Sequence, residues 1–102
     1  MKLVRDNIPE IISRSGKIPL FHLANEHEIR QLLNEKLLEE VNEFLSAPSE
    51  EELADIYEIL DAIVGEYNYD SKSISAIKEE KAKTNGSFNK KLILEGIKES
   101  DV

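Results

Sequence analysis

Apolar residues recur along the chain at the three-to-four-residue spacing of an α-helix, which predicts four helices. The first begins after Asn7, a candidate N-cap, with Pro9 in its first turn, where the missing N–H costs nothing. It ends at Ser15-Gly16. The second and longest opens with the capping-box sequence Asn25-Glu-His-Glu28 and runs to about Leu45.

The third and fourth predicted helices follow two short breaks. Ser49 caps the third helix, which runs to about Tyr67. Asp70 or Ser71 opens the fourth, which runs to about Lys83. The fold class is therefore all-α, a four-helix bundle. Short extended segments are expected near residues 18–24, where a proline disfavours helix, and near 88–94, which reads as a short strand or a last helix.

Composition narrows the class of protein. The 102 residues predict a single domain over 1–102, near the size at which a partner often completes the core. There is no cysteine, no apolar run long enough to span a membrane and no signal-peptide core, so a soluble cytoplasmic protein without membrane partners is expected. With 21 acids against 13 Lys and Arg, the net charge of -8 argues against nucleic-acid binding.

Four acids stand out from this acidic background. Glu40 and Glu43 lie three residues apart in the second predicted helix, and Glu52 and Asp55 lie three apart in the third. Side chains at this spacing share one helix face. Two such helices set antiparallel aim four carboxylates at one point, which requires cations. This arrangement predicts a Mg²⁺ site for a polyphosphate substrate.

Each acid also has an ordinary explanation. Glu40 and Glu43 could lie on a solvated face, although they fall within the apolar stripe of their helix. Glu52 fits a capping box with Ser49, which does not exclude a metal role. Asp55 is harder to explain in this way, because aspartate is a poor residue for the middle of a helix.

Other chemistry finds little support. His22 and His27 lack the spacing of a zinc site and are interpreted as surface or packing residues. No Gly-rich phosphate loop is present. Any phosphate chemistry must therefore be led by metal ions.

The paired acids belong to a longer pattern. The strings KLLEEVNEFL and EELADIYEIL resemble the paired signature E-x-x-E and E-x-x-D of the MazG-like all-α nucleoside triphosphate pyrophosphohydrolases, relatives of phosphoribosyl-ATP pyrophosphohydrolase. The opening LVRDNIPEII and the later KAKTNGSF resemble two further segments of one branch of that family. The four segments occur in order and span residues 3 to about 94.

The resemblance implies a MazG-like bundle completed by oligomerisation, as a homodimer or homotetramer. It implies that Glu40, Glu43, Glu52 and Asp55 bind Mg²⁺, for which Mn²⁺ can substitute. It also implies a house-cleaning hydrolase that cleaves a standard or modified nucleoside triphosphate between the α- and β-phosphates, giving a nucleoside monophosphate and pyrophosphate.

The remaining site residues are assigned by the chemistry of such a site. Glu39, beside the ligands, is expected to orient or deprotonate the attacking water. Lys36, Arg5 and Lys81 are the cations expected on phosphate oxygens. The alternative for Lys36 is an ion pair with Glu40, four residues along the helix.

One departure from the family pattern supports other functions. Only eight residues separate Glu43 from Glu52, fewer than family members usually have. The turn is thus expected to be tight, and the pocket on that side to lack a loop that other members use to hold the base. The alternative is a non-catalytic nucleotide-binding or oligomerising helical module that keeps the fold. A third hypothesis is a helical interaction domain whose acids are merely solvated. The sequence names neither the base nor the sugar of a substrate.

Overall fold

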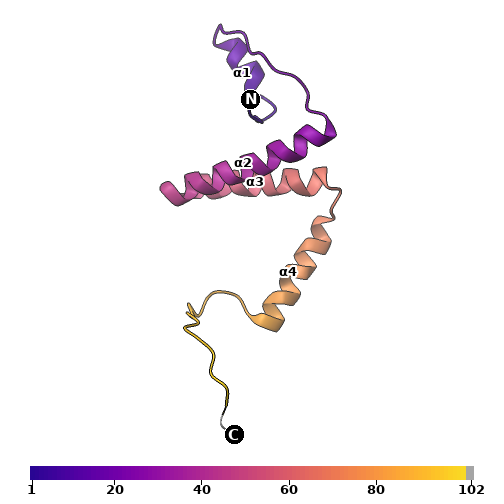
Figure 1. Cartoon of the computed structure of the whole chain (residues 1–102). Coiled ribbons are helices and arrows are strands. Elements are labelled where there is room, and N and C mark those ends of the chain that lie inside the picture. The colour runs from indigo at the N-terminus through magenta and orange to yellow at the C-terminus, as the bar shows by residue number, and fades with distance from the viewer. Residues whose placement is uncertain (101–102) are drawn as a thin grey trace. The chain divides into compact units, whose positions relative to one another are not determined.

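Four α-helices are the regular elements of residues 1–100, the part of the chain that this computed structural model describes. Helix α1 spans Ile8–Arg14, α2 Glu26–Ser46, α3 Glu50–Glu66 and α4 Ser71–Asn85 (Figure 1). No strand occurs in that range, so the all-α prediction is confirmed. The segments 18–24 and 88–94 lie outside the helices, and neither forms a strand or a further helix.

Side-chain caps fix where the two longest helices begin. The Asn25 carboxamide oxygen accepts a hydrogen bond from the backbone N–H of Glu28 at 2.8 Å, and the Ser49 hydroxyl accepts one from that of Glu52 at 3.1 Å. Both bonds satisfy donors that a helix leaves free in its first turn. The prediction for α1 was wrong in this respect. Asn7 occupies the N-cap position, but its side chain makes no capping hydrogen bond.

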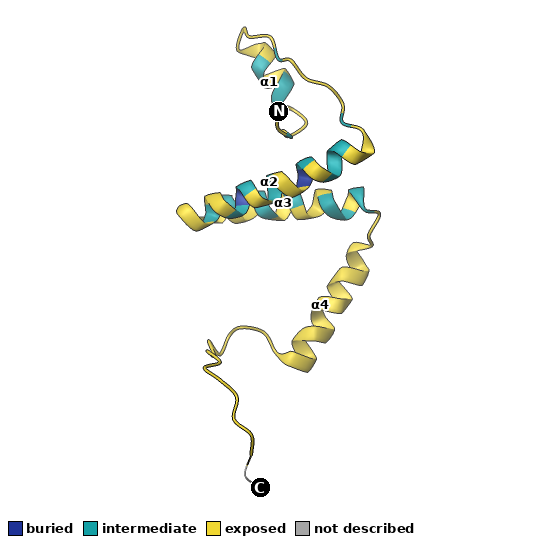
Figure 2. Cartoon of the chain, viewed as in Figure 1, coloured by how far each residue is buried: buried dark blue, intermediate teal, exposed yellow. Residues whose placement is uncertain are grey.

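Contacts divide the chain into two units, and the first, Met1–Tyr69, holds α1, α2 and α3. Helices α2 and α3 pack along each other as an antiparallel pair, joined by Ala47–Ser49 (Figure 1). Two described residues are buried, Leu33 at 2 % exposure and Glu40 at 7 %, and both belong to α2 (Figure 2). The best-protected interior of this unit is therefore one leucine and one carboxylate.

The second unit begins at Asp70 and contains α4. Asp70 caps this helix, since its carboxylate accepts a hydrogen bond from the backbone N–H of Lys72 at 3.0 Å. Gly86 ends this helix with a φ of 84°, a backbone conformation that residues with a Cβ rarely adopt. Every described residue from Asn68 on is exposed. The single-domain organisation of residues 1–102 stays a prediction.

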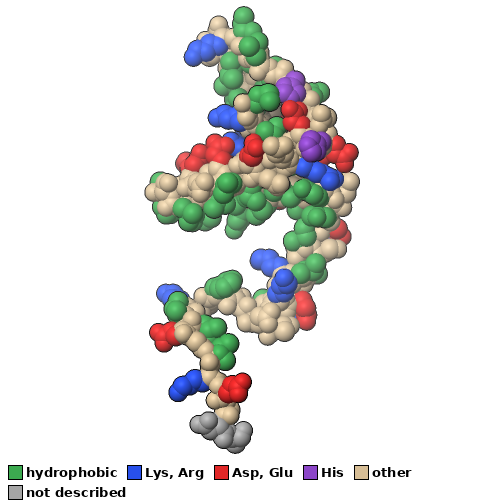
Figure 3. Space-filling model, in the orientation of Figure 1, with side chains coloured by type: hydrophobic (Ala, Val, Ile, Leu, Met, Phe, Trp, Pro, Cys, Tyr) green, Lys and Arg blue, Asp and Glu red, His purple; other side chains and the backbone are tan. Residues whose placement is uncertain are grey.

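Large apolar side chains remain in solvent on both units. Figure 3 shows hydrophobic side chains gathered along one side of the α2–α3 pair. On α3, Leu53, Tyr57 and Leu60 are 39 %, 66 % and 43 % exposed and follow one row of the helix surface. An apolar row of this kind is typical of a surface that binds another protein. Within residues 1–100 no helix is both long and apolar enough to cross a membrane.

The Ser49 cap provides a first test of this fold. We expect Ser49→Ala to lower the free energy of unfolding by about 1 kcal/mol, because the N–H of Glu52 loses its acceptor. Denaturant unfolding at a fixed protein concentration measures the change. Ser13→Ala, at an exposed position inside α1, is the matched control and should change stability by less than about 0.5 kcal/mol. Equal losses in the two variants would contradict the capping role.

Candidate metal centre

The interior position of Glu40 follows from its register on α2. Leu33 and Glu40 are seven residues apart, close to two helical turns, so they lie on the same side of the helix. That side packs against α3, and both residues are buried. Glu40 thus occupies a position in the helix contact at which the helical spacing normally places an apolar residue such as leucine.

Helix α3 supplies two carboxylates to the same place. Oxygen atoms of Glu40, Glu52 and Asp55 all lie within 4.8 Å of one another. Glu52 and Asp55 are half-buried, three residues apart in the first turns of α3. We call these three residues the interhelical trio. Its members come from both predicted pairs of acids, as the spacing analysis expects.

A second group shares Glu40 but lies entirely on α2. Oxygen atoms of Glu39, Glu40 and Glu43 also lie within 4.8 Å of one another. Glu39 is half-buried and Glu43 is exposed. The four predicted ligands are therefore divided between two groups that meet at Glu40, and Glu39, predicted as the residue that activates water, belongs to the second.

Two oxygens of this cluster are buried without a partner. Among the described residues, Glu40 Oε2 and Glu52 Oε2 are inaccessible to solvent and accept no hydrogen bond. For Glu52 this bears on the capping-box alternative. The Ser49 hydroxyl caps the helix, but this carboxylate oxygen of Glu52 makes no return bond to Ser49. A buried charged oxygen without a donor is costly, so both positions favour a bound cation.

Two basic side chains partly neutralise the cluster. Lys36 Nζ lies 3.4 Å from Glu39 Oε2 and 3.4 Å from Glu40 Oε1. Its pairing with Glu40 is the alternative considered for Lys36 from the sequence. Arg5 donates to Asp55 Oδ1 at 2.7 Å from a position fifty residues away. Five carboxylates and two cations leave an excess of negative charge.

The pKa of Glu40 reflects both its burial and this excess of negative charge. Burial raises the pKa of Glu40 above its ordinary value, and the neighbouring carboxylate of Glu43 raises it further. A hydrogen bond and the charge of Lys36 act in the opposite direction, and Asp55 contributes a smaller rise. The raised pKa means that the charged form of Glu40 is insufficiently compensated within the chain.

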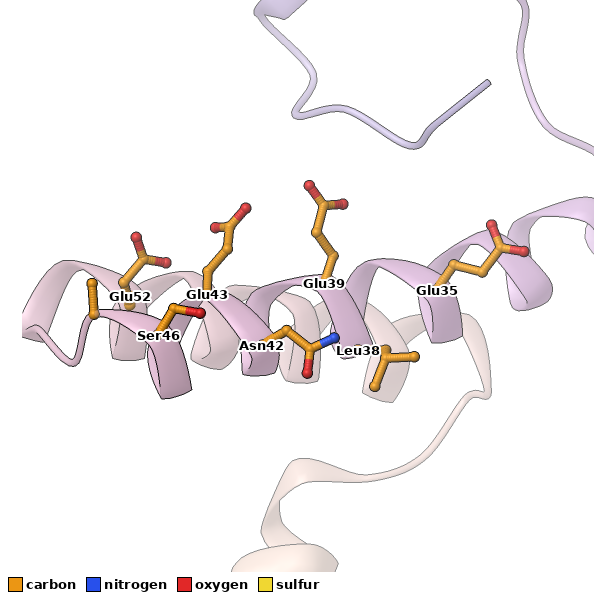
Figure 4. Close-up of a pocket in the computed structure, with 8 residues that line it drawn as sticks. Glu35, Leu38, Glu39, Asn42, Glu43, Ser46 and Glu52 are labelled. Atoms are coloured by element: carbon orange, nitrogen blue, oxygen red, sulfur yellow. The ribbon is translucent and has the colours of Figure 1, made fainter.

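An open hollow of about 680 Å³ adjoins the cluster on α2. It is lined by Glu35, Leu38, Glu39, Asn42, Glu43, Ser46, Ala47 and Glu52. Figure 4 shows the carboxyl groups of Glu35, Glu39, Glu43 and Glu52 pointing to the same side of the helix pair. An acidic hollow of this kind admits a cation with its waters more readily than a bare phosphate.

Sequence reasoning missed several of these features. It left out Glu35 and Asn42, which line the hollow because they lie four residues before and three residues after Glu39 on the surface of α2. It also left His22 without a partner, whereas His22 Nε2 lies 2.9 Å from Glu28 Oε1. Lys81 is exposed on α4, in the second unit, and its role on phosphate stays a prediction.

Replacing Glu40 tests the charge imbalance directly. In buffer without divalent ions near neutral pH, Glu40→Gln should raise the melting temperature, because the amide removes a buried charge that Lys36 only partly compensates. The raised pKa makes the folded chain bind a proton more tightly than the unfolded chain does. The cost of charged Glu40 is therefore present above the folded pKa and is relieved as pH falls through it.

The gain in Glu40→Gln should accordingly shrink as pH falls toward 4.5, the ordinary pKa of the group. Thermal unfolding followed by circular dichroism over this range measures it. Glu58→Gln, at an exposed position of α3, is the control and should leave the melting temperature unchanged. A loss of stability in Glu40→Gln near neutral pH would contradict this account of the cluster.

Comparison with known proteins adds no assignment. No family model matches the chain, no curated protein matches it, and no solved structure matches it.

Proposed function

We propose that this protein is a Mg²⁺-dependent nucleoside triphosphate pyrophosphohydrolase. The observation that carries the proposal is the interhelical trio, in which Glu40 Oε2 and Glu52 Oε2 are buried and unpartnered. The four sequence segments that resemble MazG-like enzymes support it.

The donor set suits the ion. All candidate ligands are carboxylate oxygens, which hard divalent cations such as Mg²⁺ and Mn²⁺ prefer over nitrogen or sulfur. Glu40, Glu52 and Asp55 would hold one ion, and Glu43 would complete the set from the second group. Bound there, Mg²⁺ supplies neutralisation of phosphate oxygens and a lower pKa for a coordinated water.

The remaining residues would bind the phosphate and accept a proton from water. Glu39, half-buried beside Glu43, would accept a proton from the attacking water. Lys36 would exchange part of its pairing with Glu39 and Glu40 for a phosphate oxygen as the cluster gains positive charge. The reaction consumes one water, breaks the bridge between the α- and β-phosphates, and releases a nucleoside monophosphate and pyrophosphate.

We further propose that the working form is a homo-oligomer. Leu53, Tyr57 and Leu60 form an exposed apolar row on α3, while Leu33 is the one buried apolar side chain among residues 1–100. An interior of this size gives little hydrophobic stabilisation, and a second copy packed on the row would enlarge it. Helix α4 is fully exposed, and an isolated helix of 15 residues is marginal in water.

One observation favours the second candidate, a nucleotide-binding or oligomerising module without catalysis. Only Ala47–Ser49 join α2 to α3, so this connection provides no loop beside the acidic hollow to hold a base. Under this alternative the carboxylates and cations bind a metal–nucleotide complex but do not turn it over. Calorimetric titration would then show binding with no product.

Turnover is tested with a panel of ribo- and deoxyribonucleoside triphosphates in the presence of Mg²⁺ or Mn²⁺. We expect release of pyrophosphate rather than orthophosphate, with products identified by chromatography. Glu43→Gln and Glu40→Gln should each lower turnover by about 100-fold or more, because each removes a charged ligand. Glu58→Gln is the matched control and should keep full activity. A panel without turnover above the Glu40→Gln background would reject the enzyme.

The oligomer is tested by a charge placed on the apolar row. Tyr57→Lys should lower the molar mass in solution toward the 11.6 kDa of one chain, because a lysine ammonium is costly to bury in an apolar interface. Light scattering after size-exclusion chromatography measures the mass. Glu58→Lys, the adjacent exposed position, should leave the mass unchanged. A wild-type protein that elutes as a monomer would contradict the proposal.

A further inference from the structure

Arg5 brings the N-terminal segment onto the metal-binding cluster. Its guanidinium donates to Asp55 Oδ1 at 2.7 Å, while 60 % of its side chain and 38 % of that of Asp55 remain exposed. Asp55 is also a member of the interhelical trio with Glu40 and Glu52. A single carboxylate therefore belongs both to the group of candidate ligands and to the ion pair that ties residue 5 to α3.

The two uses of Asp55 oppose each other. A divalent ion within the trio would lie a few ångströms from the guanidinium, and two cations at that separation repel. The ion pair with Arg5 is exposed, so it contributes little stability and is readily broken. Glu40 and Glu52 would hold the ion through buried oxygens that have no other partner.

We infer that Arg5 is a displaceable counter-cation, which holds the N-terminal segment on α3 until a divalent ion binds and then moves to the oxygens of an anionic substrate. The inference rests on the proposed function, since it assigns a step in the loading of the same site. The N-terminal segment held in this way comprises residues 1–17, which include α1. Arginine suits both positions, because its planar donors match carboxylate and phosphate alike.

Opposite effects on metal and on substrate distinguish this role from a structural one. Removing the guanidinium removes a competitor for Asp55, so the metal ion should bind more tightly. It also removes a phosphate ligand, so the substrate should bind more weakly. A side chain that only stabilised the fold would weaken both.

The first measurement is the dissociation constant of Mn²⁺ alone, from electron paramagnetic resonance of the free ion. We expect Arg5→Gln to lower this constant by about twofold to fivefold, the range set by an exposed ion pair. Arg14→Gln removes the same charge from the same segment, at an ion pair with Glu10 that lies apart from the trio. That control should leave the constant unchanged.

The second measurement is hydrogen exchange of the peptide that covers α1, by mass spectrometry. In the wild type, exchange should accelerate when Mg²⁺ is added and slow again when pyrophosphate is added with it. In Arg5→Gln, exchange should be fast without additions, with Mg²⁺, and with Mg²⁺ and pyrophosphate, because the ion pair with Asp55 is absent. Where turnover is measured, the same variant should raise KM.

The outcomes separate the two proposals. If the wild type binds Mn²⁺ but Arg5→Gln binds it equally or less tightly, or if exchange of α1 ignores Mg²⁺, the role of Arg5 is overturned and the pyrophosphohydrolase stands. If the wild type binds no Mn²⁺, both proposals are overturned. Tighter Mn²⁺ binding in Arg5→Gln together with exchange that responds to Mg²⁺ in the wild type supports the counter-cation.

Discussion

The structure depends on one carboxylate, Glu40, held at 7 % exposure in the contact between α2 and α3. Burial makes its charge costly, and Glu43 and Asp55 add repulsion. Lys36 pairs with one of its oxygens and leaves the other without a donor. The contact between the two helices therefore contains a buried negative charge that the chain compensates only in part. We call this the charge deficit of Glu40. A cation that binds the folded form would reduce that deficit and stabilise the fold by the same interaction.

The small apolar interior gives little hydrophobic stabilisation to offset the cost of this buried charge. Leu33 is the single buried apolar residue in the described part of the chain, while the row of Leu53, Tyr57 and Leu60 faces solvent on α3. Hydrophobic stabilisation scales with the area removed from water, so most of what this sequence could gain by burial is not realised within one chain. Helix α3 thus carries both Glu52 and Asp55, which face Glu40 of α2, and an apolar row that remains in solvent. A cation at the carboxylates and a protein surface on the row would each add stabilisation that one chain lacks.

The helices were predictable because their signals are local. The Asn25 and Ser49 caps are visible in the sequence, and both make the hydrogen bond expected of them. Asn7 is the same residue type as Asn25, but its side chain makes no capping hydrogen bond. Its backbone is helical, with φ -91° and ψ -2°, whereas a capping residue is extended, so its oxygen is not directed at the first-turn donors. Residue type predicted the start of each helix, and backbone conformation decided which start was capped.

Helix periodicity predicted which acids share a helix face, but not which acids meet between the two helices. Three-residue spacing placed each pair of acids on one face, but the packing of α2 on α3 decides that Glu40, and not Glu43, meets Glu52 and Asp55. The contact of Arg5 with Asp55 spans fifty residues and has no periodic signal at all. Chemistry still restricted the partners of Arg5, because a guanidinium seeks an oxyanion. Phosphate and carboxylate both satisfy that preference, so the partner of Arg5 depends on which charges are present nearby. A divalent ion at Glu40 would change that balance for the cations around it.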